Sequence, residues 1–401
     1  MTTELSKDIL ENHPYELRLV LDELVGGPGQ YDEVHKNPMF YIPLAGASCQ
    51  VVLAFKDKRI SSIKRGPALD EKKWGSICKQ IEARIRSGRS KFGREFSFSS
   101  FRVQGSWRGD CSHVQIMPAP EDAPSAPLEI AAHPFILEFP LVESDSLSIT
   151  NDRWRRGHRK LTLLLNILLA GHTHVAPQNA NHFWAWIFRE DGQTECKWVQ
   201  NSFFGKLGDR VISSLSPRSE QTLDELKADA YYTSVGHDGQ GLRVPNDLDE
   251  LICCYQGLSI SNSAKFDRAA YWFEMAAQQW DSCHSSSFRS LVSAIEALTE
   301  RGIKHTVYCD KCKRKCSHDS PGATENFRAF FDKYSADASL SPRRTMMYEV
   351  RSNIVHGGDL MQIDEDKYFG WDPPGSNELD LHRELFSLTR IALRNWLKNP
   401  N

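Results

Sequence analysis

The sequence contains no apolar run long enough to form a membrane-spanning helix. Its longest strongly apolar stretch, Leu161–Ala170, has about half of the roughly 20 residues that a bilayer requires. The opening residues, MTTELSKDILENHPYE, also lack the apolar core of a secretory signal peptide. These two absences predict a cytoplasmic protein with no membrane partner.

An excess of positive charge is also missing, because 49 Lys and Arg residues are balanced by 52 Asp and Glu residues, for a net charge of −3. This balance excludes a globally basic protein that coats nucleic acid. The chain has no glycine-rich phosphate-binding motif and no G-x-S-x-G motif. Nucleotide hydrolysis and esterase chemistry of the familiar kinds therefore have no support.

The length of 401 residues predicts more than one domain, and the character of the sequence changes along it. Residues 1–215 contain β-branched and aromatic runs separated by Gly, Pro and Asp clusters, which predicts a mixed, β-rich domain. Residues 216–245 are polar and form the predicted join. Residues 246–401 contain a succession of helical patterns on both sides of a cysteine-rich insertion, which predicts an all-α bundle with a small insertion. The predicted fold class is therefore α+β.

The same patterns give the individual elements. The predicted strands are Cys49–Phe55, Glu95–Val103, His113–Met117, Phe135–Val142, His182–Phe188 and Lys197–Phe204. The predicted helices are Glu71–Ser87, His158–Ala170, Gln221–Tyr231, Asp247–Gln256, Lys265–Trp280, Ser285–Gly302, Thr324–Tyr334, Pro342–His356 and Leu379–Leu397.

One predicted helix, Pro342–His356, carries two residue types suited to RNA cleavage. Arg351 and His356 stand five positions apart near its end, where the glycines that follow His356 favour a stop. An imidazole can move a proton near neutral pH, and a guanidinium can stabilise charge that develops on a phosphate. An unbroken helix separates the two residues by about 140°. The alternative is a surface arginine and a histidine placed by the helix dipole.

A carboxylate on an earlier helix can complete this pair. In the segment FRSLVSAIEALTE, Glu296 lies at the edge of an apolar stripe, from which a carboxylate can reach an arginine of a neighbouring helix. The alternative is a boundary residue that faces solvent.

A long helix, a second helix bearing SAIEALTE, an insertion and a helix ending in YEVRSNIVHGG together resemble the HEPN superfamily, and within it the Apea-like branch. The resemblance covers about Asp247–Leu397. It implies a helical bundle that pairs as a homodimer and cleaves RNA without a metal ion, leaving a 2′,3′-cyclic phosphate. It also implies a bacterial antiphage effector that cuts RNA, for example tRNA, in response to an unidentified phage or cellular trigger.

The resemblance also implies roles for single residues. Arg351 would contact the scissile phosphate, His356 would act as general acid or base, and Glu296 would orient Arg351. Ser352 stands where many members have Asn, Asp or His, and Asn353 follows it, so both belong to the candidate catalytic set. Some members of the family do not cut RNA, and the alternative function is an inactive dimerisation or RNA-binding module.

A cysteine cluster lies in the insertion at about residues 303–322. The segment YCDKCKRKCSH supplies Cys309, Cys312 and Cys316, with His318 or His305 as a fourth ligand, which predicts a structural zinc ion. The alternative is a loop of reduced thiols. The remaining cysteines are dispersed in a chain without an export signal, which predicts buried or free thiols rather than disulfides. They are Cys49, Cys78, Cys111, Cys196, Cys253, Cys254 and Cys283.

Two basic clusters suit contact with RNA. Lys311, Lys313, Arg314 and Lys315 lie in the cysteine-rich insertion. Arg153, Arg155 and Arg156 belong to the segment RWRRGHRK, in which Trp154 and His158 are suited to stacking on bases. The alternatives are solvated charge runs and an N-terminal domain that senses a trigger. The acidic run Asp364–Asp366 predicts a solvated loop rather than a two-metal site.

Overall fold

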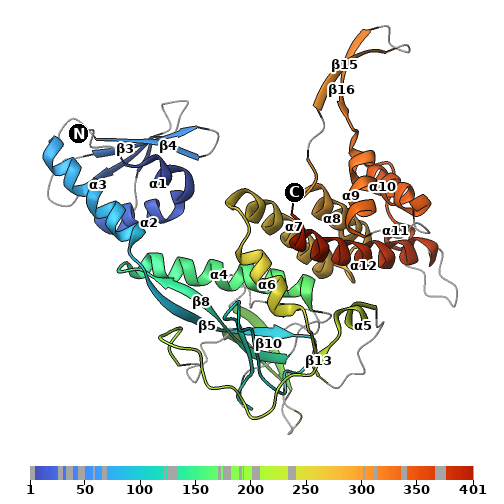
Figure 1. The fold of residues 1–401 in the computed structure, drawn as a ribbon, viewed down its shortest axis with the longest axis horizontal. Coiled ribbons are helices and arrows are strands. Elements are labelled where there is room, and N and C mark those ends of the chain that lie inside the picture. Colours follow the sequence, from blue (N-terminus) through green and yellow to red (C-terminus); the bar gives the residue numbers. More distant parts are fainter. Residues whose placement is uncertain are drawn as a thin grey trace. The chain divides into compact units, whose positions relative to one another are not determined.

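The structure is a computed structural model of the chain. It describes residues 5–25, 30–32, 39–43, 50–56, 59–65, 70–121, 123, 133–169, 173–174, 182–188, 192, 194–200, 208–233, 241–300, 303–309, 314–335, 341–365 and 376–400. The chain divides into two compact units, whose elements are labelled in Figure 1. Unit 1 comprises Met1–Arg94, Glu138–His158 and Gly208–Ser216, and unit 2 comprises Glu95–Leu137, Arg159–Leu207 and Pro217–Asn401.

The first part of unit 1 combines three helices with an antiparallel sheet. Its helices are α1 (Lys7–Asn12), α2 (Pro14–Val25) and α3 (Glu71–Arg86). Its strands are paired in the order β1 (Gln30–Asp32), β2 (Met39–Pro43), β3 (Gln50–Lys56) and β4 (Arg59–Arg65). Of these elements the sequence predicts β3 and α3 only, although Leu17, Val20 and Leu21 recur in α2 at helical spacing.

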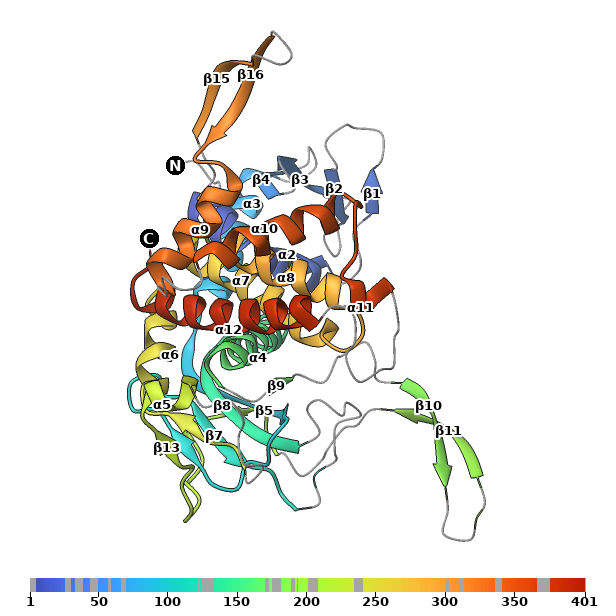
Figure 2. The same ribbon diagram turned by 90° about the vertical axis from the view of Figure 1, so that its right-hand side faces the viewer.

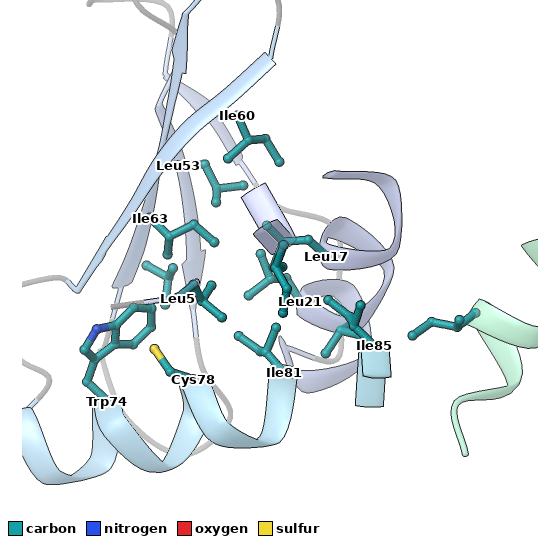
Figure 3. Packing of buried hydrophobic residues seen from close by; sticks show 14 residues of the cluster. Leu5, Leu17, Leu21, Leu53, Ile60, Ile63, Trp74, Cys78, Ile81 and Ile85 are labelled. Atoms are coloured by element: carbon teal, nitrogen blue, oxygen red, sulfur yellow. The ribbon is translucent and has the colours of Figure 1, made fainter. Parts of the chain in front are cut away.

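Helix α3 illustrates why these residues fold as they do. It begins at Asp70, whose side chain accepts a hydrogen bond from the backbone N–H of Lys73 at 2.8 Å. Its residues Trp74, Cys78 and Ile81 recur every three or four positions and are buried, so one face of the helix packs on the sheet and on α2. Figure 3 shows this core, with residues of α2, α3, β3 and β4 directed toward one another.

A second sheet has the strand order β12–β5–β8–β7–β6, and β9 pairs with β5 beside it. Its strands are β5 (Arg89–Ser99), β6 (Trp107–Arg108), β7 (Gln115–Pro118), β8 (His133–Glu143), β9 (Thr173–His174) and β12 (Val211–Ile212). The division between the units falls inside β5, β8 and helix α4 (Leu147–Leu168). The units therefore interleave along the chain, whereas the sequence predicts one boundary region at residues 216–245.

Unit 2 contains further short β elements. Strands β10 (His182–Phe188) and β11 (Thr194–Gln200) form an antiparallel hairpin, and β13 (Glu225–Leu226) pairs in parallel with β14 (Val244–Pro245). Helix α5 covers only Ala228–Thr233. The predicted helix Gln221–Tyr231 is therefore wrong in its first half, because Glu225 and Leu226 pair with β14 instead.

The helices after residue 246 pack around a buried apolar core (Figures 1 and 2). They are α6 (Leu248–Gln256), α7 (Ile260–Gln279), α8 (His284–Glu296), α9 (Ala323–Tyr334), α10 (Ser341–Val355), α11 (Gln362–Glu365) and α12 (Ser376–Lys398). Helix α8 packs against α7, α10 and α12. Helices and sheets together confirm the mixed α+β class.

The predicted insertion at about residues 303–322 lies between two helices, and the sequence predicts no helix within it. Strands β15 (Ile303–Cys309) and β16 (Arg314–Ser320) form an antiparallel hairpin there. The run Thr306, Val307 and Tyr308 is typical of a strand, since β-branched and aromatic residues favour extended backbone. That local preference outweighs the helical character of the surrounding sequence.

His382 is a fully buried polar residue of this core. Its ring stacks on Trp280 at 4.1 Å between centroids, and its Nε2 is hydrogen-bonded to the Ser287 hydroxyl at 2.9 Å. Burial lowers the pKa of His382 to about 3, with further lowering by His284 and Arg383 and an opposing effect from Asp364. The imidazole is therefore neutral in the native protein at neutral pH.

This burial predicts a loss of stability in mild acid. In the unfolded chain a histidine takes up a proton near pH 6.5, whereas native His382 stays neutral down to about pH 3. The free energy of unfolding should therefore fall by about 2 kcal/mol on its account between pH 7 and pH 5. Urea unfolding of wild type and His382→Phe at both pH values measures this, because the variant should lose that part of the pH dependence. An equal fall in the variant would contradict the prediction.

Candidate functional site

The candidate site lies where the end of α8 meets the last turns of α10. Glu296 is the final residue of α8, and Arg351 lies on the side of α10 that packs against it. Arg351 Nη2 donates a hydrogen bond to Glu296 Oε2 at 2.8 Å. The Arg351 side chain is 20% exposed and that of Glu296 is 31% exposed, so the ion pair is at the surface and partly shielded from water. The structure thus brings these two candidate residues together.

Tyr348 is a third member of this cluster, and the sequence does not single it out. Its hydroxyl donates to the other carboxylate oxygen, Glu296 Oε1, at 3.0 Å. Its ring centroid lies 5.5 Å from the guanidinium carbon of Arg351, and Phe327 packs against the same ring. Burial and the adjacent Glu296 carboxylate raise the pKa of Tyr348, so its hydroxyl remains a donor. The sequence feature that could have identified Tyr348 is its position three residues before Arg351, because residues i and i+3 of a helix are neighbours.

The end of α10 fixes the direction of His356. The backbone N–H of His356 still bonds to the carbonyl of Ser352 at 3.0 Å, as in a helix. Gly357 then has a φ of +70°, and the N–H of Gly358 returns to the Asn353 carbonyl at 2.9 Å. Since the helical path continues to His356, it leaves the axis about 140° away from Arg351.

The other candidate residues of α10 differ in their exposure and contacts. His356 and Asn353 are exposed, and Asn353 Nδ2 donates to Asp359 Oδ2 at 3.4 Å. Ser352 is half-buried and uses its carbonyl in the helix. Within the described residues, no hydrogen bond or ion pair joins Arg351 to His356. One copy of the chain therefore presents an oriented cation and an imidazole on different sides of one helix.

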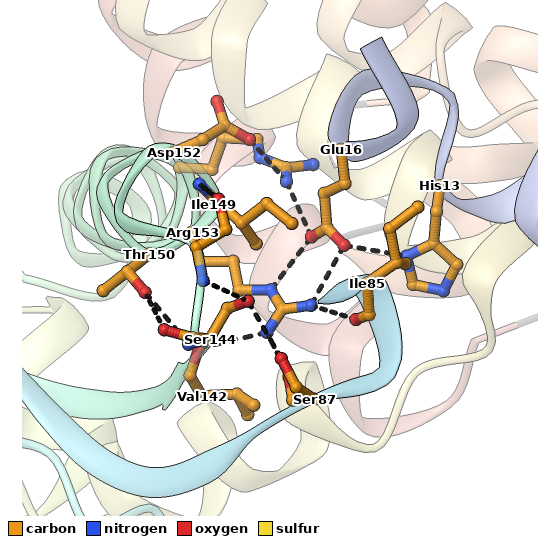
Figure 4. A network of polar contacts seen from close by, with 12 residues as sticks. His13, Glu16, Ile85, Ser87, Val142, Ser144, Ile149, Thr150, Asp152 and Arg153 are labelled. Atoms are coloured by element: carbon orange, nitrogen blue, oxygen red, sulfur yellow. Dashed lines mark hydrogen bonds and ion pairs between the residues drawn. The ribbon is translucent and has the colours of Figure 1, made fainter. Parts of the chain in front are cut away.

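The basic cluster of α4 has a structural role at Arg153. Its guanidinium donates to both Glu16 oxygens at 3.0 Å, as Figure 4 shows. It also bonds to three backbone carbonyls, those of Ile85, Ser87 and Val142. These five hydrogen bonds match the number of N–H donors that a guanidinium has. Burial alone would raise the pKa of Glu16, but Arg153 lowers it. Arg153 therefore has no donor left for RNA.

The neighbours of Arg153 differ in availability. Arg156 bonds to Glu16 at 3.2 Å and to Asp152 at 2.6 Å, and Arg155 bonds to Asp152 at 3.0 Å. The Arg155 side chain is 55% exposed and that of Arg156 is 45% exposed. Of the three predicted RNA contacts on α4, Arg155 and Arg156 therefore remain accessible, and Arg155 is the more exposed.

The interpretation of Trp154 and His158 as base-stacking residues is wrong. Both are buried, and their rings are stacked at 6.1 Å between centroids. Trp154 Nε1 donates to the carbonyl of Arg94, and the guanidinium of Arg210 lies over the indole. Burial, followed by the charge of Arg210, lowers the pKa of His158 to about 3. Both aromatic residues belong to the core of unit 1.

The cysteine-rich hairpin is described in part. Its register pairs Cys309 with Arg314, Val307 with Cys316, and His305 with His318. Arg314 and Lys315 are exposed. Cys312, Lys311 and Lys313 lie outside the described residues. The described part of the chain shows no cluster of three or more potential metal ligands.

The interpretation of Asp364 as a solvated loop residue is wrong. Its carboxylate accepts the backbone N–H groups of His284 at 3.0 Å and Ser285 at 2.6 Å. These are the first residues of α8, so Asp364 caps the helix that ends at Glu296. Burial opposes ionisation, but the hydrogen bonds from Ser285 and His284 lower the pKa of Asp364. Asp366 lies outside the described residues.

The prediction that the dispersed cysteines are all thiols is wrong for two of them. Cys111 and Cys253 form a disulfide, whereas Cys78, Cys254 and Cys283 remain thiols. Cys49 lies outside the described residues. Sequence spacing gave no signal, since the two partners are 142 residues apart.

Among the described helices, none combines the length and apolar character needed to span a bilayer.

Comparison with known proteins identified no relative of the chain. No protein-family model, no curated protein and no solved structure matches the chain.

Proposed function

We propose that the chain is a metal-independent endoribonuclease with a HEPN-type helical bundle at residues 246–401. The observation that carries the proposal is the pair formed by Arg351 and Glu296, held at the surface of the bundle by Tyr348. A guanidinium fixed by a carboxylate and by an aromatic ring is oriented before substrate arrives, which favours stabilisation of charge in a transition state. His356 supplies a proton-transferring group at the end of the same helix.

The proposed reaction uses the ribose of the substrate as nucleophile. His356 takes the proton of the 2′-OH, and the 2′-oxygen attacks the adjacent phosphorus. Arg351 stabilises the negative charge that develops on the phosphate oxygens. The bond to the 5′-oxygen breaks, and this oxygen receives a proton from an imidazolium. The products are a 2′,3′-cyclic phosphate and a 5′-hydroxyl end. Asn353 and Ser352 lie between the two groups in sequence and are proposed to position the phosphate.

Two copies of the chain are proposed to form the complete site. Arg351 and His356 leave α10 about 140° apart, so within one copy they point to different sides of the helix. Val355 is 42% exposed and lies four residues after Arg351, on the same side of α10, so a second copy can cover an apolar side chain next to the arginine. A homodimer through these helices would bring the arginine of one copy toward the histidine of the other.

The hairpin β15–β16 is proposed to hold a structural zinc ion and to contact the RNA backbone. Its register places Cys309 and Cys316 within two positions of each other across the strands. His305 and His318 pair about 7 Å beyond Cys316 and about 14 Å beyond Cys309, at about 3.4 Å per residue. The register therefore supports Cys309 and Cys316 as ligands of one ion, while Cys312 lies outside the described residues. A zinc ion there would fix the fold of the insertion.

The proposed RNA contacts are the exposed Arg314 and Lys315, with Lys311 and Lys313 of the same insertion and Arg155 of α4. The proposed biological role is that of a cytoplasmic antiphage effector that cuts RNA, for example tRNA. The first 215 residues would recognise the substrate or an unidentified phage or cellular trigger.

Incubation of the purified chain with RNA in EDTA tests the activity. We expect cleavage with 2′,3′-cyclic phosphate ends, and a loss of about 100-fold or more in Arg351→Ala, since removal of an oriented transition-state donor has an effect of this size. Arg383→Ala is the matched control, because Arg383 is exposed and bonds only to Asp380 in the described structure. Cleavage that persists undiminished in Arg351→Ala would overturn the assignment.

The alternative is an RNA-binding or dimerisation module without catalysis. The bond between Arg351 and Glu296 favours it, because a partly buried ion pair can serve the packing of α8 and α10 alone. Under this alternative, RNA binds in EDTA and remains intact.

A further inference from the structure

The turn between β6 and β7 is covalently attached to helix α6. Cys111 lies in this turn and Cys253 in α6, and their sulfur atoms are bonded with 6.3 Å between the Cα atoms. Cys111 is exposed and Cys253 is partly exposed, so solvent reaches the bond from the turn side. Both residues belong to unit 2. The bond joins the sheet to the helices that carry the candidate site.

A second set of contacts holds the same turn without the disulfide. Asp249, four residues before Cys253, accepts the backbone N–H groups of Cys111 and Ser112 at 2.9 Å each. Gln256 Nε2 donates to the Ser112 carbonyl at 3.1 Å. Gly109 packs directly against the Asp249 carboxylate, where a Cβ atom would clash. The turn therefore stays next to α6 when the sulfur–sulfur bond is open.

Helix α6 connects this turn to the helices of the site. Asp247, at the start of α6, bonds to Arg394 at 2.6 Å and to Lys398 at 3.1 Å. Both partners are on α12, which packs against α8 and α10. Those two helices carry Glu296 and Arg351. Helix α6 is thus separated from the two helices of the candidate site by one intervening helix.

We propose that Cys111 and Cys253 form a reversible redox modification site that fastens the sheet of unit 2 to its helices. In a cytoplasmic protein a disulfide is transient rather than permanent, which fits an accessible bond backed by noncovalent contacts. The oxidant class is a small disulfide such as oxidised glutathione. The thiolate of Cys111 attacks it and releases one glutathione thiolate, and Cys253 then displaces the second. Two cysteine thiols are oxidised, one glutathione disulfide is reduced to two thiols, and the two protons pass to the glutathione thiolates.

Alkylation of the native full-length protein in glutathione mixtures tests the proposal, which does not depend on RNA cleavage. After equilibration with oxidised glutathione, peptides containing Cys111 and Cys253 should be disulfide-linked and protected from iodoacetamide. After equilibration with reduced glutathione, both should be alkylated, and reoxidation should restore the link. Two outcomes overturn the proposal: full alkylation under oxidising conditions, or a link that reduced glutathione and dithiothreitol leave intact in the native protein.

Two neighbouring serine variants distinguish the bond from general effects on α6. Hydrogen exchange at the amides of Cys111 and Ser112 reports how firmly the turn is held, because both donate to Asp249. Reduction should speed this exchange in wild type and in Cys254→Ser, since Cys254 is a free thiol beside Cys253. In Cys253→Ser the exchange should be fast from the start and insensitive to reduction. Redox-insensitive exchange in wild type would contradict a fastening role.

Discussion

Two inactive variants, Arg351→Ala and His356→Ala, are expected to regain about a quarter of the wild-type rate of RNA cleavage when mixed as equal amounts of subunits. Half of the random dimers contain one copy of each variant, and half of the sites in those dimers combine an intact arginine with an intact histidine. Alone, His356→Ala should lose between about 10²-fold and 10⁴-fold, the usual range for removing a general acid or base. Arg351→Ala alone should lose about 100-fold or more, as expected for an oriented transition-state donor. The physical reason is the divergence of the two side chains along α10.

The measurement requires subunit exchange by joint refolding or coexpression, followed by cleavage assays in EDTA. Arg351→Ala mixed with Glu296→Ala is the matched control, because Glu296 bonds to Arg351 within one copy. In each mixed dimer of that control, one site has no arginine and the other has an arginine without its carboxylate. Mixing should therefore give no rescue. Mixed dimers of Arg351→Ala and His356→Ala that stay inactive, although gel filtration shows them to be dimers, would contradict a shared site.

Local signals predicted the limits of several helices. Helices α3, α6, α9 and α10 begin and end within one or two residues of their predicted limits. Their limits are set by capping residues, periodic apolar positions and terminal glycines, all of which are local in sequence. Apolar periodicity placed Glu296 at the edge of its helix, within reach of an arginine, and the family resemblance identified that arginine as Arg351.

The same local signals could not predict contacts between residues that are distant in the sequence. The disulfide of Cys111 joins it to a cysteine 142 residues away, and Asp364 caps a helix that begins 80 residues earlier. The hydrogen bond of Tyr348 was not predicted, since it depends on where α8 ends. Charged residues were the most misleading, because a run of arginines predicts solvent exposure unless its buried partners are known.

Arg153 shows what such a buried charge contributes, and Arg153→Met is expected to destabilise unit 1 by about 3 kcal/mol. The substitution keeps an apolar chain of similar length but removes five hydrogen bonds. Three backbone carbonyls lose a hydrogen-bond donor. Among the described residues, the buried Glu16 carboxylate then keeps only His13 and Arg156 as ion-pair partners. Arg155→Met is the matched control. Its exposed ion pair with Asp152 should contribute under about 1 kcal/mol.

Hydrogen exchange of the α3 amides measures the opening of unit 1 in both variants, and RNA binding by the same proteins separates structure from recognition. If Arg153 acts through Glu16, Arg153→Met should accelerate exchange in α3 while Arg155→Met leaves it almost unchanged. RNA affinity should follow the opposite order at low salt, because Arg155 is the accessible cation and Arg153 has no free donor. A loss of RNA affinity in Arg153→Met with unchanged exchange would show instead that its ion pair opens to bind phosphate. In that case, contact with RNA would be the main role of Arg153. Its hydrogen bonds with α2 and α3 would only neutralise its charge when RNA is absent.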